Sequence, residues 1–135
     1  MSLLEGRSSA ALARPRPVAQ IIRALEGHRL PIGREADFHG CVAEVLTRAG
    51  FVAQPEYSLG PGLGRIDFFV PLERVGIELK VKGSPSGVAE QLLRYMASPQ
   101  VASLILVTGR AALGALPRVL GGKPLYIASV WKGLL

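Results

Sequence analysis

The chain has 135 residues, a length that fits one domain of ordinary size. Its composition, 49% hydrophobic and 19% charged, excludes disorder of the whole chain and permits a packed core. The formal net charge is +6, and residues 1–34 carry six arginines against two glutamates. This balance favours a polyanionic partner, of which nucleic acid is the commonest.

The single cysteine, Cys41, cannot form an internal disulfide, and one cysteine with two histidines cannot supply the usual four ligands of a structural zinc site. No apolar run approaches the ~20 residues that span a bilayer. The first 17 residues contain charged side chains where a signal peptide needs an apolar core. We therefore expect a cytoplasmic protein without a membrane role.

Residues 1–17 are expected to form a flexible basic arm, with residues 18–135 as a single domain. The R-P-R-P sequence at its end favours this interpretation, because proline removes backbone donors and restricts the preceding residue. Arg14 and Arg16 would then contact a DNA backbone. The alternatives are an arm that packs on a partner subunit and an inert leader.

Apolar periodicity and turn residues predict the other elements in chain order. The expected helices are 18–26, 34–49 closed by Gly50, a helix opened by Ser84-Pro85 and running to about Ala97, and one around 110–118. The expected strands are 51–59, 65–70, 75–82, 101–108 and 125–130. From the second helix onward the order is α-β-β-β-α-β-α-β, which predicts an α/β protein with a mixed sheet and helices on both faces.

The strand at 75–82 alternates apolar and polar side chains, which places Glu78 and Lys80 on one face. Asp67 is the charged residue of the neighbouring strand, and hairpin pairing can bring its carboxylate beside that of Glu78. Two acids and a lysine would then share one patch. The alternative is a solvated sheet face with a cross-strand salt bridge.

The helix at 34–49 places Glu35 in its apolar stripe, whereas Asp37 and Glu44 fall on the solvent side. A buried carboxylate needs a partner, so Glu35 either belongs to a site or merely stabilises the helix N-terminus or pairs with an arginine. His39 borders the same stripe, either as a packed histidine or as a neighbour of the site.

The helix that begins at Ser84 repeats this pattern. Gln91 lies within its apolar stripe, one turn before Tyr95. A polar side chain again faces the sheet, and the alternative is a buried structural amide.

Together these residues resemble the PD-(D/E)XK nuclease superfamily, which includes many restriction enzymes, archaeal-type Holliday-junction resolvases and RecB-type nucleases. The resemblance covers about 34–130, and Ile66 stands where the name-giving proline would be. It implies a restriction-endonuclease-like mixed β-sheet core flanked by helices. The motifs that carry it are the helix with Glu35, Asp67 in R-I-D-F-F-V, the E-L-K triplet Glu78-Leu79-Lys80, and Gln91 and Tyr95 in Q-L-L-R-Y.

The resemblance implies a catalytic role for each motif. Asp67 and Glu78 would hold Mg²⁺ together with the backbone carbonyl of Leu79, and Mn²⁺ would substitute. Lys80 would orient or activate the attacking water and offset charge on the phosphate. Glu35 would reach the same metal through water or complete a second site.

Three further residues have implied roles around the DNA. Gln91 and Tyr95 would fix the strand or a phosphate near the metal, and Lys82 is a weaker candidate for a backbone contact. The expected function is that of a Mg²⁺-dependent deoxyribonuclease, which acts as an endonuclease or an exonuclease. It would cut branched, broken or single-stranded DNA in repair, recombination or phage DNA processing. A homodimer would allow two strands to be cut. The alternatives are a catalytically inactive DNA-binding or assembly module on the same fold, and an RNA substrate.

Overall fold

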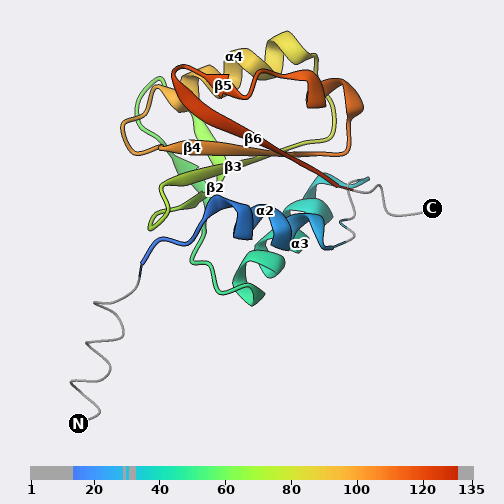
Figure 1. The fold of residues 1–135 in the computed structure, drawn as a ribbon. Coiled ribbons are helices and arrows are strands. Elements are labelled where there is room, and N and C mark those ends of the chain that lie inside the picture. Colours follow the sequence, from blue (N-terminus) through green and yellow to red (C-terminus); the bar gives the residue numbers. More distant parts are fainter. Residues whose placement is uncertain (1–13, 29, 31–32, 131–135) are drawn as a thin grey trace.

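The computed structural model describes residues 14–28, 30 and 33–130. Within these residues, six strands form a mixed sheet with α2 and α3 on one face and α4 on the other, so the predicted α/β class is confirmed (Figure 1). The helices are α2 (Val18–Glu26), α3 (Glu35–Arg48), α4 (Pro85–Met96) and the short 3-10 helix η1 (Ala111–Ala115). The strands are β1 (Gln54–Ser58), β2 (Arg65–Val70), β3 (Val75–Lys80), β4 (Ser103–Thr108), β5 (Val119–Leu120) and β6 (Lys123–Ser129).

The sheet order β1-β2-β3-β4-β6-β5 combines both kinds of pairing. The first three strands are antiparallel neighbours, β4 lies parallel to both β3 and β6, and β5 forms an antiparallel hairpin with β6. As a consequence, the start of β2 and the carboxyl ends of β3, β4 and β6 meet at one edge of the sheet. This end of the sheet, called the site edge below, is where Asp67, Glu78 and Lys80 lie.

Two hydrophobic layers hold the sheet between the helices. The layer on the α2 and α3 side includes Phe38, Ile77 and Ile105, and the layer on the α4 side includes Leu92 and Leu104. All six residues of β4 are buried, as expected of a strand covered on both faces. Among the described residues, no helix has both the length and the apolarity needed to cross a membrane.

Local sequence signals account for the helix ends. Gly50 follows α3 with a φ of 86°, the left-handed conformation that glycine adopts freely. Ser84 precedes α4, and its side chain accepts a hydrogen bond from the backbone N–H of Gly87 at 3.1 Å. Both predicted boundaries are confirmed.

The end of the chain differs from the expectation. The helix expected around 110–118 is the single 3-10 turn η1, followed by the unpredicted strand β5. Gly114 and Pro117 explain the difference, because glycine weakens a helix and proline ends it. The strands expected at 51–59, 75–82 and 125–130 are β1, β3 and β6, each shifted or shortened by one to three residues at an end.

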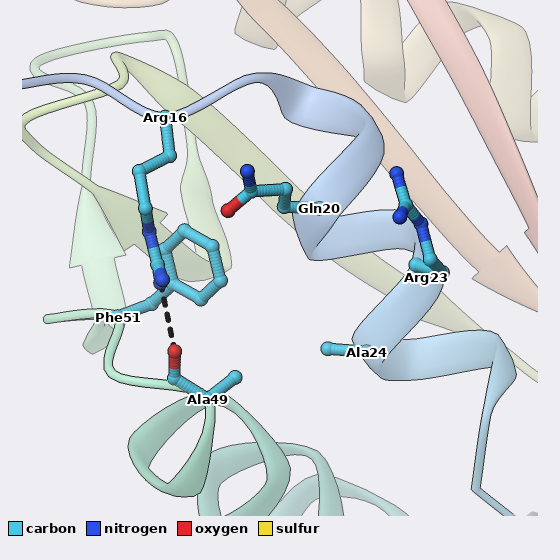
Figure 2. A pocket seen from close by; sticks show the side chains of 6 residues that line it. All are labelled: Arg16, Gln20, Arg23, Ala24, Ala49 and Phe51. Carbon is cyan, nitrogen blue, oxygen red and sulfur yellow. Dashed lines mark hydrogen bonds between the residues drawn. The ribbon is translucent and has the colours of Figure 1, made fainter.

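The prediction of a flexible arm through residue 17 is wrong for Arg16, whereas residues 1–13 lie outside the described part. The backbone N–H of Arg16 donates to Glu73 Oε2 at 2.8 Å, and its guanidinium donates to the Ala49 carbonyl at 2.8 Å. Its carbon Cζ lies 3.6 Å from the centre of the Phe51 ring. Figure 2 shows Arg16 beside Phe51 and Ala49 in an open pocket that is also lined by Gln20, Arg23 and Ala24.

Candidate functional site

Asp67 and Glu78 face each other where β2 parts from β3. The antiparallel register pairs Phe68 with Ile77, which places Asp67 opposite Glu78. The Asp67 backbone N–H donates to Glu78 Oε1 at 3.1 Å, and the Leu79 backbone N–H donates to Asp67 Oδ2 at 2.8 Å. Each carboxylate therefore accepts a hydrogen bond from a backbone N–H of the opposite strand, where a regular ladder would use a backbone carbonyl. The predicted approach of Asp67 and Glu78 is confirmed.

The regular alternation of side chains between the two faces of the sheet is interrupted in β2 at Asp67. Strict alternation would send Ile66 and Phe68 to the same face, but Ile66 packs in the layer next to α4 and Phe68 in the layer next to α3. The local twist leaves the Asp67 side chain at the site edge. It can therefore contact groups from β3 and from α3.

Glu78 is the most deeply buried acid of the site, with 4% of its surface exposed. Its Oε2 lies 3.3 Å from Gln91 Nε2, 3.4 Å from the Tyr95 hydroxyl and 3.6 Å from Lys80 Nζ. The structure therefore gathers Gln91, Tyr95 and Lys80 around one carboxylate oxygen.

The helix α4 holds Gln91 and Tyr95 one turn apart on its sheet-facing side. Gln91 Nε2 donates to the Tyr95 hydroxyl at 2.8 Å, and that hydroxyl donates to the Arg65 carbonyl at 2.9 Å. Gly64 allows this approach, because a Cβ there would lie 3.0 Å from the tyrosine ring and the residue has a φ of 94°. These bonds tie α4 to the start of β2 and fix the surroundings of Glu78.

Burial governs the protonation of the site. The pKa of Glu78 is raised to about 8, first by burial and then by the charge of Asp67. Burial also raises the pKa of Asp67, although the backbone N–H of Leu79 opposes this effect. The pKa of Tyr95 is raised by burial and by the charge of Glu78, so its hydroxyl stays a neutral donor. The two carboxyl groups therefore favour any cation that can enter between them.

The interpretation of Glu35 as a buried residue is wrong. Phe38, Val42, Val45 and Leu46 form the buried stripe as predicted, but Glu35 is exposed. It is the first residue of α3, and the whole first turn projects beyond the packed part of the helix, because Phe38 is the first buried residue. Glu35 still lies one turn before His39 on the same side of α3.

The other predicted residues lie at different places. Lys82 follows β3 at the site edge and is exposed, and Arg14 is exposed at the beginning of the described chain. Arg16 contacts Glu73 in the turn between β2 and β3, which is the end of that hairpin away from Asp67. The predicted contact of Arg16 with DNA is therefore not supported by its place, since its guanidinium is engaged within the protein.

Sequence reasoning missed Glu56. The register of β1 pairs Pro55 with Phe68 and Tyr57 with Ile66, which sets Glu56 opposite Asp67. Glu56 Oε1 lies 3.5 Å from His39 Nε2. A lone acid in a short strand that contains proline was the only signal in the sequence, and it gained meaning only from the pairing with β2.

No family model, no curated protein and no solved structure matches this chain. The resemblance to PD-(D/E)XK nucleases is therefore a hypothesis carried by the residues above and by their arrangement.

Proposed function

We propose that the chain is a metal-dependent deoxyribonuclease with a restriction-endonuclease-like core, whose site is formed by Asp67, Glu78 and Lys80. The observation that carries the proposal is the juxtaposition of the buried Glu78 carboxyl group, the partly buried Asp67 carboxyl group and a lysine amine at the site edge, where the two strands separate. The order α3-β1-β2-β3-α4-β4, with β3 and β4 parallel, agrees with the core that the resemblance implies.

The residues present fit a Mg²⁺ ion. Mg²⁺ prefers oxygen ligands and is commonly held by one or two carboxylates while keeping several waters. The groups around the Glu78 oxygens lie at 3.1 to 3.6 Å, longer than strong hydrogen bonds, so a cation can compete with them. Asp67 and Glu78 would hold the ion, with the Leu79 carbonyl as a third ligand. When bound, the ion would polarise the phosphate and acidify a coordinated water.

Lys80 would act on the phosphate group of the substrate, which would approach the carboxyl pair from solvent. Its side chain is 24% exposed and its amine lies 3.6 Å from Glu78 Oε2, so it reaches the surface beside the carboxyl pair. A fixed ammonium there would orient the attacking water and offset the charge that develops on the phosphate. Gln91 and Tyr95 would hold Glu78 in position through their bonds to its Oε2 and to each other.

DNA is the substrate favoured by the charge of the chain and of the site edge. The net charge is +6, and exposed basic residues lie at the start of β2 and just after β3 and β4, namely Arg65, Lys82 and Arg110. They would bind the phosphate backbone on either side of the cleaved bond. A role in repair, recombination or phage DNA processing, in the cytoplasm and as a homodimer, extends the same proposal.

The test is incubation of the whole chain with linear, supercoiled, single-stranded and four-way-junction DNA in Mg²⁺, Mn²⁺ or EDTA. The proposal predicts cleavage of at least one of these DNA forms with Mg²⁺ or Mn²⁺ and none in EDTA. RNA of the same sequence separates a deoxyribonuclease from a ribonuclease. Cleavage that persists in EDTA would contradict the metal-dependent mechanism.

One observation favours a non-cleaving DNA-binding or assembly module instead. Both oxygens of Glu78 already have hydrogen-bond partners within the protein, so the carboxyl group can be satisfied without a cation. In that case the same incubations would give DNA binding in a gel-shift assay, equal with and without metal, and no cleavage.

A further inference from the structure

His39 presents a buried nitrogen that has no hydrogen-bond partner among the described residues. This atom is Nε2, and the ring that carries it stacks on Phe68 with 4.4 Å between the ring centres and an angle of 29°. The stacking fixes the plane of the ring. A buried polar atom without a partner is costly, so the position requires an explanation beyond packing.

Glu56 faces the same nitrogen from β1 in a strained backbone conformation. Its φ is 49°, in the left-handed region that residues other than glycine and asparagine seldom adopt. Such a conformation is energetically costly and is concentrated at functional sites. Its Oε1 lies 3.5 Å from His39 Nε2, which is longer than an ordinary hydrogen bond, so an ion pair between the two does not satisfy the nitrogen.

Asp67 completes a group of three. One ligand atom from each of His39, Glu56 and Asp67 lies within 4.8 Å of the others. Atoms bound to one ion at about 2.1 Å lie about 3.0 to 3.4 Å apart, so small side-chain rotations would close the group around a cation. The half-exposed side chain of Glu56 can move in this way, and the buried ring nitrogen of His39 lies 3.5 Å from Glu56 Oε1 with no hydrogen bond to break among the described residues.

We propose that His39, Glu56 and Asp67 form a second cation site, selective for a divalent transition metal such as Mn²⁺ over Mg²⁺. An imidazole nitrogen is a good ligand for the later divalent metals, whereas Mg²⁺ favours an all-oxygen set. The site shares Asp67 with the proposed hydrolytic site, but its existence does not require that the chain cleaves DNA. If both sites were filled, Asp67 would contribute a ligand to each of them.

The test is direct metal binding without DNA. Free Mn²⁺ is measured by electron paramagnetic resonance during titration of the whole chain, with and without excess Mg²⁺. The wild-type chain is expected to bind two Mn²⁺, of which excess Mg²⁺ displaces one. Glu56→Gln and His39→Gln are expected to weaken the Mg²⁺-resistant ion by at least about tenfold, since even the loss of a group outside the ligands commonly costs that much.

Controls separate this proposal from the proposed function. Glu44→Gln changes an acid on the solvent side of the same helix α3 and should leave both ions in place. Glu78→Gln should remove the Mg²⁺-displaceable ion and keep the resistant one. Glu56→Gln lies at an exposed position, so its effect does not depend on the fold being disturbed.

If Glu56→Gln and His39→Gln bind Mn²⁺ as the wild type does, the second site does not exist, and the nuclease proposal is unaffected. If the wild type binds one Mn²⁺ that Mg²⁺ cannot displace and that these two variants lose, the second site stands and the Mg²⁺ site at Glu78 fails.

Discussion

Removing the ionisable group of Glu78 should change how the stability of the protein depends on pH. The Glu78→Gln substitution keeps the size of the side chain but cannot titrate. The pKa of Glu78 is raised from its ordinary value of 4.5 to about 8, first by burial and then by the charge of Asp67. Because deprotonation is harder in the folded chain, the free energy of unfolding of the wild type falls as the pH rises from about 4.5 to about 8.

The expected size of this effect follows from the same values. Each pH unit between 4.5 and about 8 lowers the contribution of Glu78 to the free energy of unfolding by roughly 1 kcal/mol or slightly more. The total approaches about 5 kcal/mol as an upper bound, because a relaxed site or entering water would reduce the cost. This is a large part of the roughly 5–15 kcal/mol that stabilises a typical domain.

Urea unfolding between about pH 5 and about pH 9, in EDTA, measures the effect. The difference between Glu78→Gln and the wild type should shift in favour of the variant by several kcal/mol as the pH rises. The matched control is Glu90→Gln, which changes an exposed acid of α4. Its stability should depend on pH as that of the wild type does. Curves for Glu78→Gln and the wild type that stay parallel over this range would refute the argument that Glu78 is a buried, proton-holding group.

Three other substitutions test separate contacts. Tyr95→Phe removes the hydroxyl that accepts from Gln91 and donates to a backbone carbonyl, and should cost about 1–3 kcal/mol in urea unfolding; an unchanged midpoint would contradict these bonds. Glu35→Gln should change stability by less than about 0.5 kcal/mol, since the residue is exposed and not in the buried stripe, and Glu44→Gln should do the same; a larger loss for Glu35→Gln would restore its predicted burial. Arg16→Ala should cost about 1–2 kcal/mol through the lost ring contact and hydrogen bond, without changing the salt dependence of DNA affinity; a flatter salt slope would instead assign Arg16 to the DNA.

Local patterns in the sequence predicted most of the helices and strands, and they predicted the site residues that surround Glu78. The alternation of β3 placed Glu78 and Lys80 on one face, and the stripe of α4 placed Gln91 and Tyr95 toward the sheet. Each of these two pairs is predicted from the periodicity of side chains within one strand or one helix. The structure brings Lys80, Gln91 and Tyr95 together around Glu78 Oε2.

The errors concern features that depend on tertiary packing. Helical phase gives the direction of Glu35 but not where the packed part of α3 begins, so its burial was wrongly predicted. The position of Glu56 opposite Asp67 required the register between β1 and β2. The contacts of Arg16 with Ala49 and Phe51 join distant segments, so the composition of the arm could not reveal them.

Cleavage by Lys80→Ala tests the central claim most directly, because the proposal gives Lys80 a role only in the chemical step, at the attacking water and the phosphate. Single-turnover cleavage of DNA with Mg²⁺ or Mn²⁺, at saturating protein, compares the wild type, Lys80→Ala, Asp67→Asn and Lys82→Ala. The account predicts that Lys80→Ala and Asp67→Asn lose cleavage by orders of magnitude while DNA affinity largely survives. Lys82→Ala removes the same charge two residues away, from a proposed backbone contact. It should therefore lower DNA affinity but cleave at the wild-type rate once the protein is saturating. Cleavage at the wild-type rate by Lys80→Ala or Asp67→Asn would contradict the account.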